Sequence, residues 1–255
     1  MSGWTAIVLA GSRPGPDSFA QRHGTDLKAL IPVGGQPMVA RPVAVLLDGE
    51  RFAAVRVLAQ QPERIAAVLP KDPRLSVEPS ADTIASTLER LCNDPATNWP
   101  LLVTTADHAL LDPAMIADFC GQGRAADIAI GVVEQRALLK RLPATRRTWI
   151  RFRGGAYSGA NLFLLCSPRA SSAVQLWRSV EQDRKSGWRL LVALGPALFL
   201  GAALRLLTLD QVLARIGAKL GLTVRAVVMA DPLAAVDVDK DSDHRLVEQL
   251  LAARR

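Results

Sequence analysis

The chain has 255 residues, of which 49% are hydrophobic and 22% charged. This composition disfavours disordered and low-complexity proteins and is sufficient for a buried core. The net charge of +7 suits anionic partners, but aromatic residues make up 5% of the chain, too few for a surface that stacks single-stranded nucleic acid. We therefore expect no nucleic-acid partner.

Cysteine and histidine are few and dispersed. There are three of each, without a CxxC pair: Cys92, Cys120, Cys166, His23, His108 and His244. A disulfide framework and a zinc site are therefore not expected. The N-terminus reads as a strand and lacks the charged region of a signal peptide. Together these features predict a cytoplasmic protein with its thiols reduced.

Short apolar runs alternate with amphipathic segments along the chain. The runs predict strands at 5–11, 53–60, 101–105, 127–133, 149–152, 161–165 and 222–229. Between them, helices are predicted at 37–47, 83–92, 113–120, 168–182 and 243–255, and a polar loop at 12–25. Ser80 and Asp82 can cap the helix at 83–92. Such alternation predicts a mostly parallel sheet covered by helices on both faces, with ligands bound at the carboxyl ends of the strands.

Residues 190–207 form the most apolar stretch. They approach the length of a membrane span, but Pro196 and Arg205 interrupt them, and a spanning helix needs about 20 apolar residues. A buried or half-buried helix is the simpler interpretation. The alternative is a peripheral contact with a membrane or a lipid acceptor, favoured by basic residues just before the stretch.

The first predicted strand ends in a glycine-containing loop, LAGSRPG, and LKALIPVGG follows downstream. Because Gly11 has no Cβ, backbone amides there can approach phosphate oxygens, and Arg13 and Lys28 can neutralise a triphosphate. The spelling is neither GxGxxG nor GxxxxGK[ST], which argues against a Rossmann dinucleotide site and excludes a P-loop. An ordinary strand-to-helix turn would give the same local pattern.

Two acidic motifs lie further along the chain. Asp107 follows the strand LLVTT, where it can hold a hard cation such as Mg²⁺ or cap a helix. The run DVDKDSD places Asp237 and Asp239 on one face of an extended segment and leaves Asp243 free to cap the last helix. The run is not an EF-hand loop, and a solvated acidic turn is the alternative. Either Asp237 or Asp239 can be the second metal ligand.

In order and spelling, these elements resemble the MobA-like NTP transferase family, which includes molybdenum-cofactor guanylyltransferases and sugar-phosphate nucleotidylyltransferases. LAGSRPG and KALIPVGGQPM, within residues 9–38, resemble the opening pattern of the family. Thr105-Ala106-Asp107 matches its T-x-D, and Asp237-Val238-Asp239 with Asp243 matches its closing motif. SGANLFLL, at 158–165, looks like its acceptor-side element.

The resemblance implies a three-layer α/β/α fold, the Rossmann-like GT-A fold of nucleotide-diphospho-sugar transferases. It implies one domain over 1–255 with a helical apolar insertion at about 184–222. The NTP would be bound by the loop from Leu9 through the amides of Ala10, Gly11 and Ser12, together with Arg13 and Lys28. Ser86 resembles a position that lines the nucleobase pocket. Asp107 and Asp239 would hold Mg²⁺, and with Lys28 they form the implied catalytic set.

The expected function is transfer of NMP from an NTP to a small phosphorylated acceptor or lipid precursor, with release of pyrophosphate. The nucleobase is left open. One alternative is a nucleotide-sugar-dependent glycosyltransferase of the same fold, which would release NDP instead. The other is a non-catalytic protein that binds anionic polymers or membranes, which the net charge and the 190–207 stretch favour.

Overall fold

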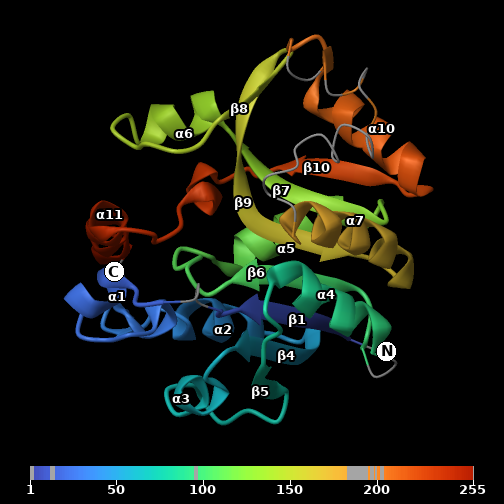
Figure 1. Cartoon of the computed structure of the whole chain (residues 1–255). Helices are drawn as coiled ribbons and strands as arrows, with labels where there is room; N and C mark the ends of the chain where they lie inside the picture. Colours follow the sequence, from blue (N-terminus) through green and yellow to red (C-terminus); the bar gives the residue numbers. More distant parts are fainter. Residues whose placement is uncertain are drawn as a thin grey trace.

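The computed structural model describes residues 3–11, 15–94, 97–182, 195, 198, 200–201 and 204–254. One sheet runs through this part in the order β10-β7-β9-β6-β1-β4-β5, with β8 paired to β9 (Figure 1). Its strands are β1 (Trp4–Leu9), β4 (Phe52–Ala59), β5 (Leu75–Pro79), β6 (Leu101–Thr105), β7 (Ile128–Glu134), β8 (Ile150–Phe152), β9 (Gly155–Leu165) and β10 (Val224–Val228). Its pairs are parallel except those that involve β9.

Helices cover both faces of this sheet. They are α1 (Ser18–Arg22), α2 (Ala40–Leu47), α3 (Pro62–Ala66), α4 (Ile84–Asn93), α5 (Pro113–Gly123), α6 (Gln135–Arg141), α7 (Ser171–Gln182), α10 (Leu209–Leu220) and α11 (Asp241–Ala252). The described residues also form the 3₁₀ turns η1 (Lys28–Leu30), η2 (Pro168–Ala170) and η3 (Pro232–Ala235) and a small hairpin of β2 (Pro32–Val33) and β3 (Gln36–Pro37).

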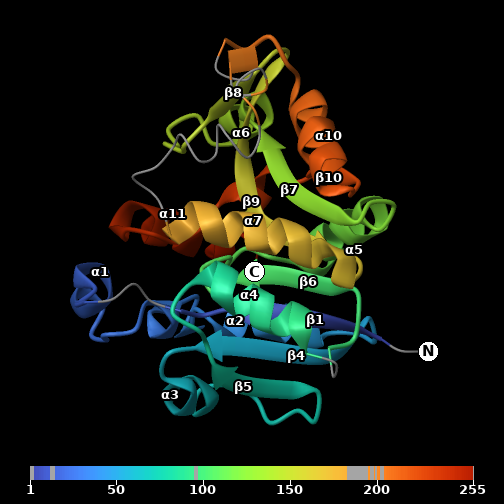
Figure 2. The ribbon, with the colours of Figure 1, turned by 45° about the vertical axis from the view of Figure 1, so that its right-hand side comes forward.

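Side chains of β1 alternate between two cores. Val8 packs with Leu46 of α2 and Phe119 of α5, whereas Ile7 packs with Leu88 of α4 and Val174 of α7. Helices α4 and α7 accordingly lie side by side on one face (Figures 1 and 2). The predicted three-layer α/β/α architecture with a mostly parallel sheet is confirmed.

Several predicted boundaries need correction. The loop at 12–25 contains α1, which forms because the Asp17 carboxylate accepts bonds from the amides of Phe19 and Ala20 at its start. The helix expected from residue 37 begins at Ala40, since the preceding residues form β3. The strand expected at 161–165 is the end of β9, which begins at Gly155 because its first half pairs with β8 and β7.

The capping expectations are also wrong at two helices. At α4 the cap is Thr83, whose hydroxyl accepts from the Ser86 amide at 3.1 Å, rather than a neighbouring serine or aspartate. At α11 the helix begins at Asp241, two residues earlier than expected. Asp243 therefore lies inside the first turn and accepts a bond from the Asp239 amide at 3.3 Å.

The apolar stretch at 190–207 falls largely outside the described residues. Of those described, Leu198 and Leu207 are buried, while Leu200, Leu204 and Leu206 are exposed. Of the helices that the structure describes, none combines the length and apolar character needed to cross a membrane. Within the insertion expected at 184–222, the structure shows α10, and the single-domain boundaries remain a prediction.

Candidate active site

The predicted phosphate loop and the predicted metal carboxylate start from neighbouring strands. Leu9 at the end of β1 pairs with Thr105 at the end of β6, and the Ala106 amide donates to the Leu9 carbonyl at 2.9 Å. Because these strands are parallel, Gly11 and Asp107 follow the same edge of the sheet. This is the edge at which open α/β sheets bind ligands.

Three charged side chains meet at this edge. Lys28 opens η1, and its Nζ donates to Asp107 Oδ2 at 2.6 Å and also contacts Asp239 Oδ1. Lys28 and Asp107 are about four-fifths buried, with 22% and 19% of their side chains exposed, whereas Asp239 is 61% exposed. The structure therefore brings together the three residues that the sequence singled out for catalysis, from three distant parts of the chain.

The charge of Lys28 is set by two opposing influences. Burial, the largest of them, lowers the pKa of the amine, but Asp107 and Asp239 together raise the pKa above its ordinary value. Lys28 is consequently an ammonium group at neutral pH. Asp107 is held from its other side, because the Thr105 hydroxyl donates to Asp107 Oδ1 at 2.5 Å.

Helices α1 and α11 bring Lys28 and Asp239 together. Arg22 at the end of α1 forms an ion pair of 2.8 Å with Asp241 at the start of α11, and the His23 imidazole lies 3.1 Å from the same carboxylate. Figure 1 shows the two helices next to each other. Lys28 follows α1 and Asp239 precedes α11, so the contact between the two helices holds these two residues near each other.

The two acidic candidates of the closing motif have different partners. Asp239 contacts Lys28, whereas Asp237 is bound by the guanidinium of Arg147 and, at 3.4 Å, by the amide of Asn161. Between them, the Val238 amide donates to the Asp107 carbonyl at 3.2 Å. The geometry thus favours Asp239 over Asp237 as the partner of Asp107. Arg147 and Asn161 were not among the predicted site residues, although Asn161 lies in SGANLFLL, the segment that looks like the acceptor-side element of the family.

Most of the other residues predicted to bind the nucleotide lie in the loop after β1, and the contacts described there do not include Lys28, Asp107 or Asp239. The Ala10 amide donates to the Leu58 carbonyl at 2.9 Å, so strand pairing continues past Leu9, and phosphate binding by this amide stays a prediction. Gly11 is exposed and faces Gln60, whose Nε2 would lie 3.1 Å from an added Cβ. Ser12 and Arg13 lie outside the described residues.

Ser86 lies in the first turn of α4, where its hydroxyl oxygen accepts from the Thr83 hydroxyl at 3.0 Å. No contact joins it to the Lys28 centre in the described part of the chain, and its place in a base pocket remains a prediction.

His108 is buried next to Asp107 and does not extend the charged centre. Its Nδ1 lies 3.3 Å from the Thr104 hydroxyl, and burial lowers the pKa of the imidazole to about 4. It is therefore neutral at physiological pH. Acid–base chemistry at this edge cannot draw on a charged His108.

The donor set at the centre fits Mg²⁺. Mg²⁺ prefers hard oxygen ligands and binds through one or two carboxylates together with substrate phosphates and water. Asp107 and Asp239 direct one oxygen each at the same ammonium group, so both already face a single positive charge. Within the described ranges no group of three or more His, Cys, Asp or Glu side chains is placed to hold a metal ion.

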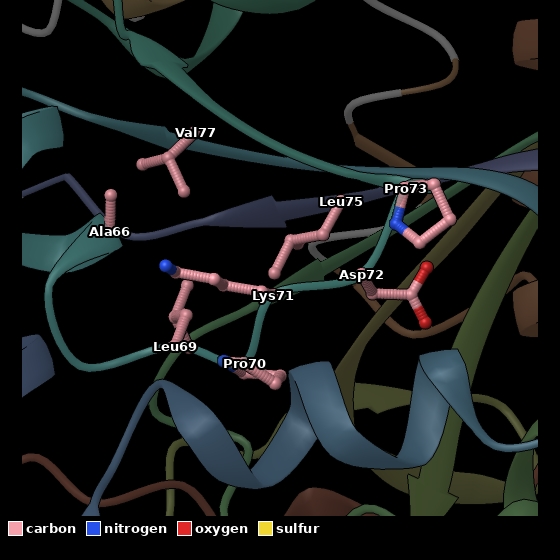
Figure 3. A pocket seen from close by; sticks show the side chains of 8 residues that line it. All are labelled: Ala66, Leu69, Pro70, Lys71, Asp72, Pro73, Leu75 and Val77. Carbon is pink, nitrogen blue, oxygen red and sulfur yellow. The ribbon is translucent and has the colours of Figure 1, made fainter.

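A groove elsewhere on the molecule does not coincide with this centre. It is formed by α3, β5 and the loop between them (Figure 3), and its lining residues are Ala66, Leu69, Pro70, Lys71, Asp72, Pro73, Leu75 and Val77. None of the predicted site residues lines it. The charged centre is thus identified by its side chains rather than by this groove.

The MobA-like NTP transferase domain model matches residues 6–218, most of the chain. The chain belongs to the MobA-like NTP transferase family. Membership makes it a nucleotidyltransferase by class, as the motifs of the sequence implied. The match includes Lys28 and Asp107 and ends before Asp239.

Solved structures agree with this assignment of fold. A hypothetical transferase from Thermus thermophilus is 29% identical, with a TM-score of 0.79 and coverage of 95% of this chain and 99% of that one. The 4-diphosphocytidyl-2C-methyl-D-erythritol synthase of Anaerococcus prevotii is 10% identical, with a TM-score of 0.62 and coverage of 98% and 96%. The 2-C-methyl-D-erythritol 4-phosphate cytidylyltransferase of Thermus thermophilus is 16% identical, with a TM-score of 0.52 and coverage of 99% and 100%. Comparison with curated proteins found no match.

Proposed function

We propose that this MobA-like protein transfers NMP from an NTP to a small phosphorylated acceptor and releases pyrophosphate, with Mg²⁺ as its cofactor. The observation that carries the proposal is the convergence of Lys28, Asp107 and Asp239 at the carboxyl edge of the sheet. A metal–triphosphate complex needs carboxylates that can bind the metal and a positive charge that can offset the phosphates, and these three side chains provide both. Membership of an NTP transferase family supplies the reaction class.

In this proposal Asp107 and Asp239 hold Mg²⁺, which supplies positive charge to the phosphates when bound. Lys28 donates to the triphosphate, and the amides of Gly11 and Ser12 with the Arg13 guanidinium bind its oxygens. An oxygen of the acceptor phosphate attacks the α-phosphorus in line, the bond to the β-phosphate oxygen breaks, and pyrophosphate leaves. The acceptor phosphate is already anionic, so the protein acts through positioning and charge rather than through a general base.

The proposal covers the domain and the substrate as well. Residues 1–255 act as one nucleotidyltransferase domain, and Ser86 lines the pocket of the nucleobase. Cytidylyltransferases among the fold relatives make CTP one of the NTPs to test, although identities of 10% and 16% to them carry the fold alone.

The exposed leucines of the apolar stretch favour a lipid-linked acceptor. Leu200, Leu204 and Leu206 are exposed beside Arg205, and the Leu207 carbonyl binds the Arg153 amide, which follows β8, at 2.9 Å. Apolar side chains next to basic ones suit the surface of an anionic bilayer. We expect the protein to sediment with anionic phospholipid vesicles and Leu204→Ser/Leu206→Ser to remain in solution. Equal sedimentation of both proteins would contradict this contact.

Thermal unfolding with each NTP in turn tests the proposed nucleotide site. Ligand binding stabilises the folded state by an amount that grows with the logarithm of the ratio of ligand concentration to Kd, so one NTP with Mg²⁺, well above its Kd, should raise Tm by several degrees. The shift should disappear with EDTA and in Asp107→Asn. A shift with a nucleotide sugar, and none with any NTP, would instead support a glycosyltransferase of the same fold.

A further inference from the structure

We infer that Arg147 and Asn161 are positioning residues that hold Asp237, and that Asp237 anchors the segment which presents Asp239 to the metal. The inference deepens the proposed function and rests on it for the role of Asp239. Asp237 is then an anchor and not a metal ligand. Neither Arg147 nor Asn161 needs to touch the substrate for this role.

The segment that carries Asp239 has little secondary structure to fix it. Residues 236–239 lie between η3 and α11 and belong to neither helix nor strand. Val238 is fully buried, and its amide donates to the Asp107 carbonyl at 3.2 Å, while the Asp239 amide donates to Asp243 at 3.3 Å. The position of the Asp239 carboxylate therefore depends on side-chain contacts on both sides of Val238.

Arg147 makes two of these contacts. It exposes 9% of its side chain, binds the Asp237 carboxylate, and donates from Nη2 to the Asp237 carbonyl at 3.1 Å. The fork of the guanidinium thus fixes both the side chain and the backbone of one residue. Burial of a guanidinium is costly unless its charge is compensated. Arg147 lies in a loop before β8, so helix packing does not account for this placement.

The electrostatic surroundings of Arg147 match this role. Burial lowers the pKa of the guanidinium, while the nearby charges of Asp243, Asp239 and Asp107 oppose that change. The buried Nε atom has no hydrogen-bond partner within the described part of the chain. Arg147 thus contacts Asp237 and lies in the negative potential of the acidic centre. The unpaired Nε is a cost of this position, because a buried donor without a partner is unfavourable.

Asn161 holds Asp237 from β9 through a distorted backbone. Its φ angle is +50°, a left-handed conformation inside a strand, and the pairing of β9 with β7 shifts register between Ile130 and Val132. Asparagine tolerates this conformation better than most residues that carry a Cβ. The side chain then reaches Asp237 Oδ2 at 3.4 Å. Local strain retained in a sheet is a feature that clusters at functional sites.

Both oxygens of Asp237 are consequently engaged, Oδ1 by Arg147 and Oδ2 by Asn161. The neighbouring Asp239 carboxylate is exposed and meets only Lys28 among the described ion pairs. A metal would have to displace Arg147 or Asn161 to bind Asp237, whereas at Asp239 it has to displace a single ammonium group. This division of partners is the basis for the two different roles.

Binding of Mn²⁺ with inorganic triphosphate, followed by electron paramagnetic resonance, tests the inference without knowledge of the nucleobase. Loss of residues that orient metal ligands costs about 10- to 100-fold in metal affinity. We expect Asn161→Gly and Arg147→Met each to weaken Mn²⁺–triphosphate binding by about tenfold or more. Arg146→Met, which removes the exposed neighbouring arginine, should bind as the parent protein does.

Asn161→Gly is the decisive variant because it changes no charge and glycine adopts a positive φ without strain. An unchanged Tm shows that the variant is folded, so that any weaker binding comes from loss of the amide contact. If Asn161→Gly folds and binds Mn²⁺–triphosphate as tightly as the parent, the inference is overturned. If Arg147→Met does not fold, Asn161→Gly still decides.

A double-mutant cycle separates an anchor from a metal ligand. If Arg147 and Asp237 act as a unit, Arg147→Met/Asp237→Asn binds no more weakly than Arg147→Met alone. If Asp237 ligates the metal itself, the two losses multiply and the anchor role fails. Asp107→Asn is the reference: if it leaves Mn²⁺–triphosphate binding intact, the proposed function fails at its metal site, whatever the other variants do.

Discussion

Asp107→Asn is expected to lower kcat for NMP transfer by about 10²- to 10³-fold, the usual loss when one stabiliser of transition-state charge is removed. The asparagine oxygen can still accept from Thr105, so the loop keeps its local geometry. What disappears is the negative charge that faces Lys28 and, in the proposed reaction, Mg²⁺. The measurement is turnover at saturating NTP and Mg²⁺.

Asp48→Asn is the matched control for this variant. Asp48 is exposed at the end of α2, and the same substitution there removes one carboxylate from the surface. Its turnover should equal that of the parent. If Asp107→Asn also turns over normally, Asp107 does not hold the metal and the proposed centre is wrong.

Lys28→Met is expected to have two effects of opposite sign. It should lower kcat/KM for the NTP by about 10²-fold, because the triphosphate loses a buried cation. It should also strengthen binding of Mn²⁺ to the nucleotide-free protein, by roughly tenfold, because Asp107 and Asp239 lose the ammonium that neutralises them. Steady-state kinetics and Mn²⁺ titration measure the two effects separately.

Lys140→Met on the exposed side of α6 removes the same charge away from the carboxylates and should change neither quantity. A Lys28→Met protein that lost activity but gained no metal affinity would show that the lysine does not occupy the place of the metal. Unchanged activity would remove Lys28 from the mechanism altogether.

Most of the fold was predictable from periodicity. Apolar runs such as those of β1 and β6 have no alternation, because parallel strands buried on both faces need apolar side chains throughout. The antiparallel insertion of β9 between β6 and β7 was not predicted. Its first half, which includes Tyr157 and Ser158, does not form an apolar run in the sequence and becomes a strand by pairing with β8 and β7.

Helix starts were harder to predict than strands. Ser80, Asp82 and Thr83 are all residues that cap helices, and the sequence does not show which has the extended backbone that a cap requires. The structure gives that conformation and the capping bond to Thr83. The same ambiguity displaced the start of α11, where Asp243 bonds to Asp239 instead of capping.

The site divides in the same way. Lys28, Asp107 and Asp239 were predicted because each belongs to a recognisable motif. Arg147 was not predicted as a site residue, because its partner Asp237 lies 90 residues away. A contact at that separation is set by how the strands are ordered, which a single sequence does not reveal. The hydrogen bond of the Ala10 amide with the Leu58 carbonyl was not predicted for a related reason, because it depends on which strand lies next to β1.

The most direct test of the central claim is identification of the leaving group. The protein would be incubated with Mg²⁺, γ-labelled NTPs and a panel of phosphorylated sugars, alditols and lipid precursors, with Asp107→Asn in parallel. We predict labelled pyrophosphate that forms with one NTP, depends on an acceptor and is absent in the variant. Release of NDP from a nucleotide sugar, with no pyrophosphate from any NTP, would contradict the account.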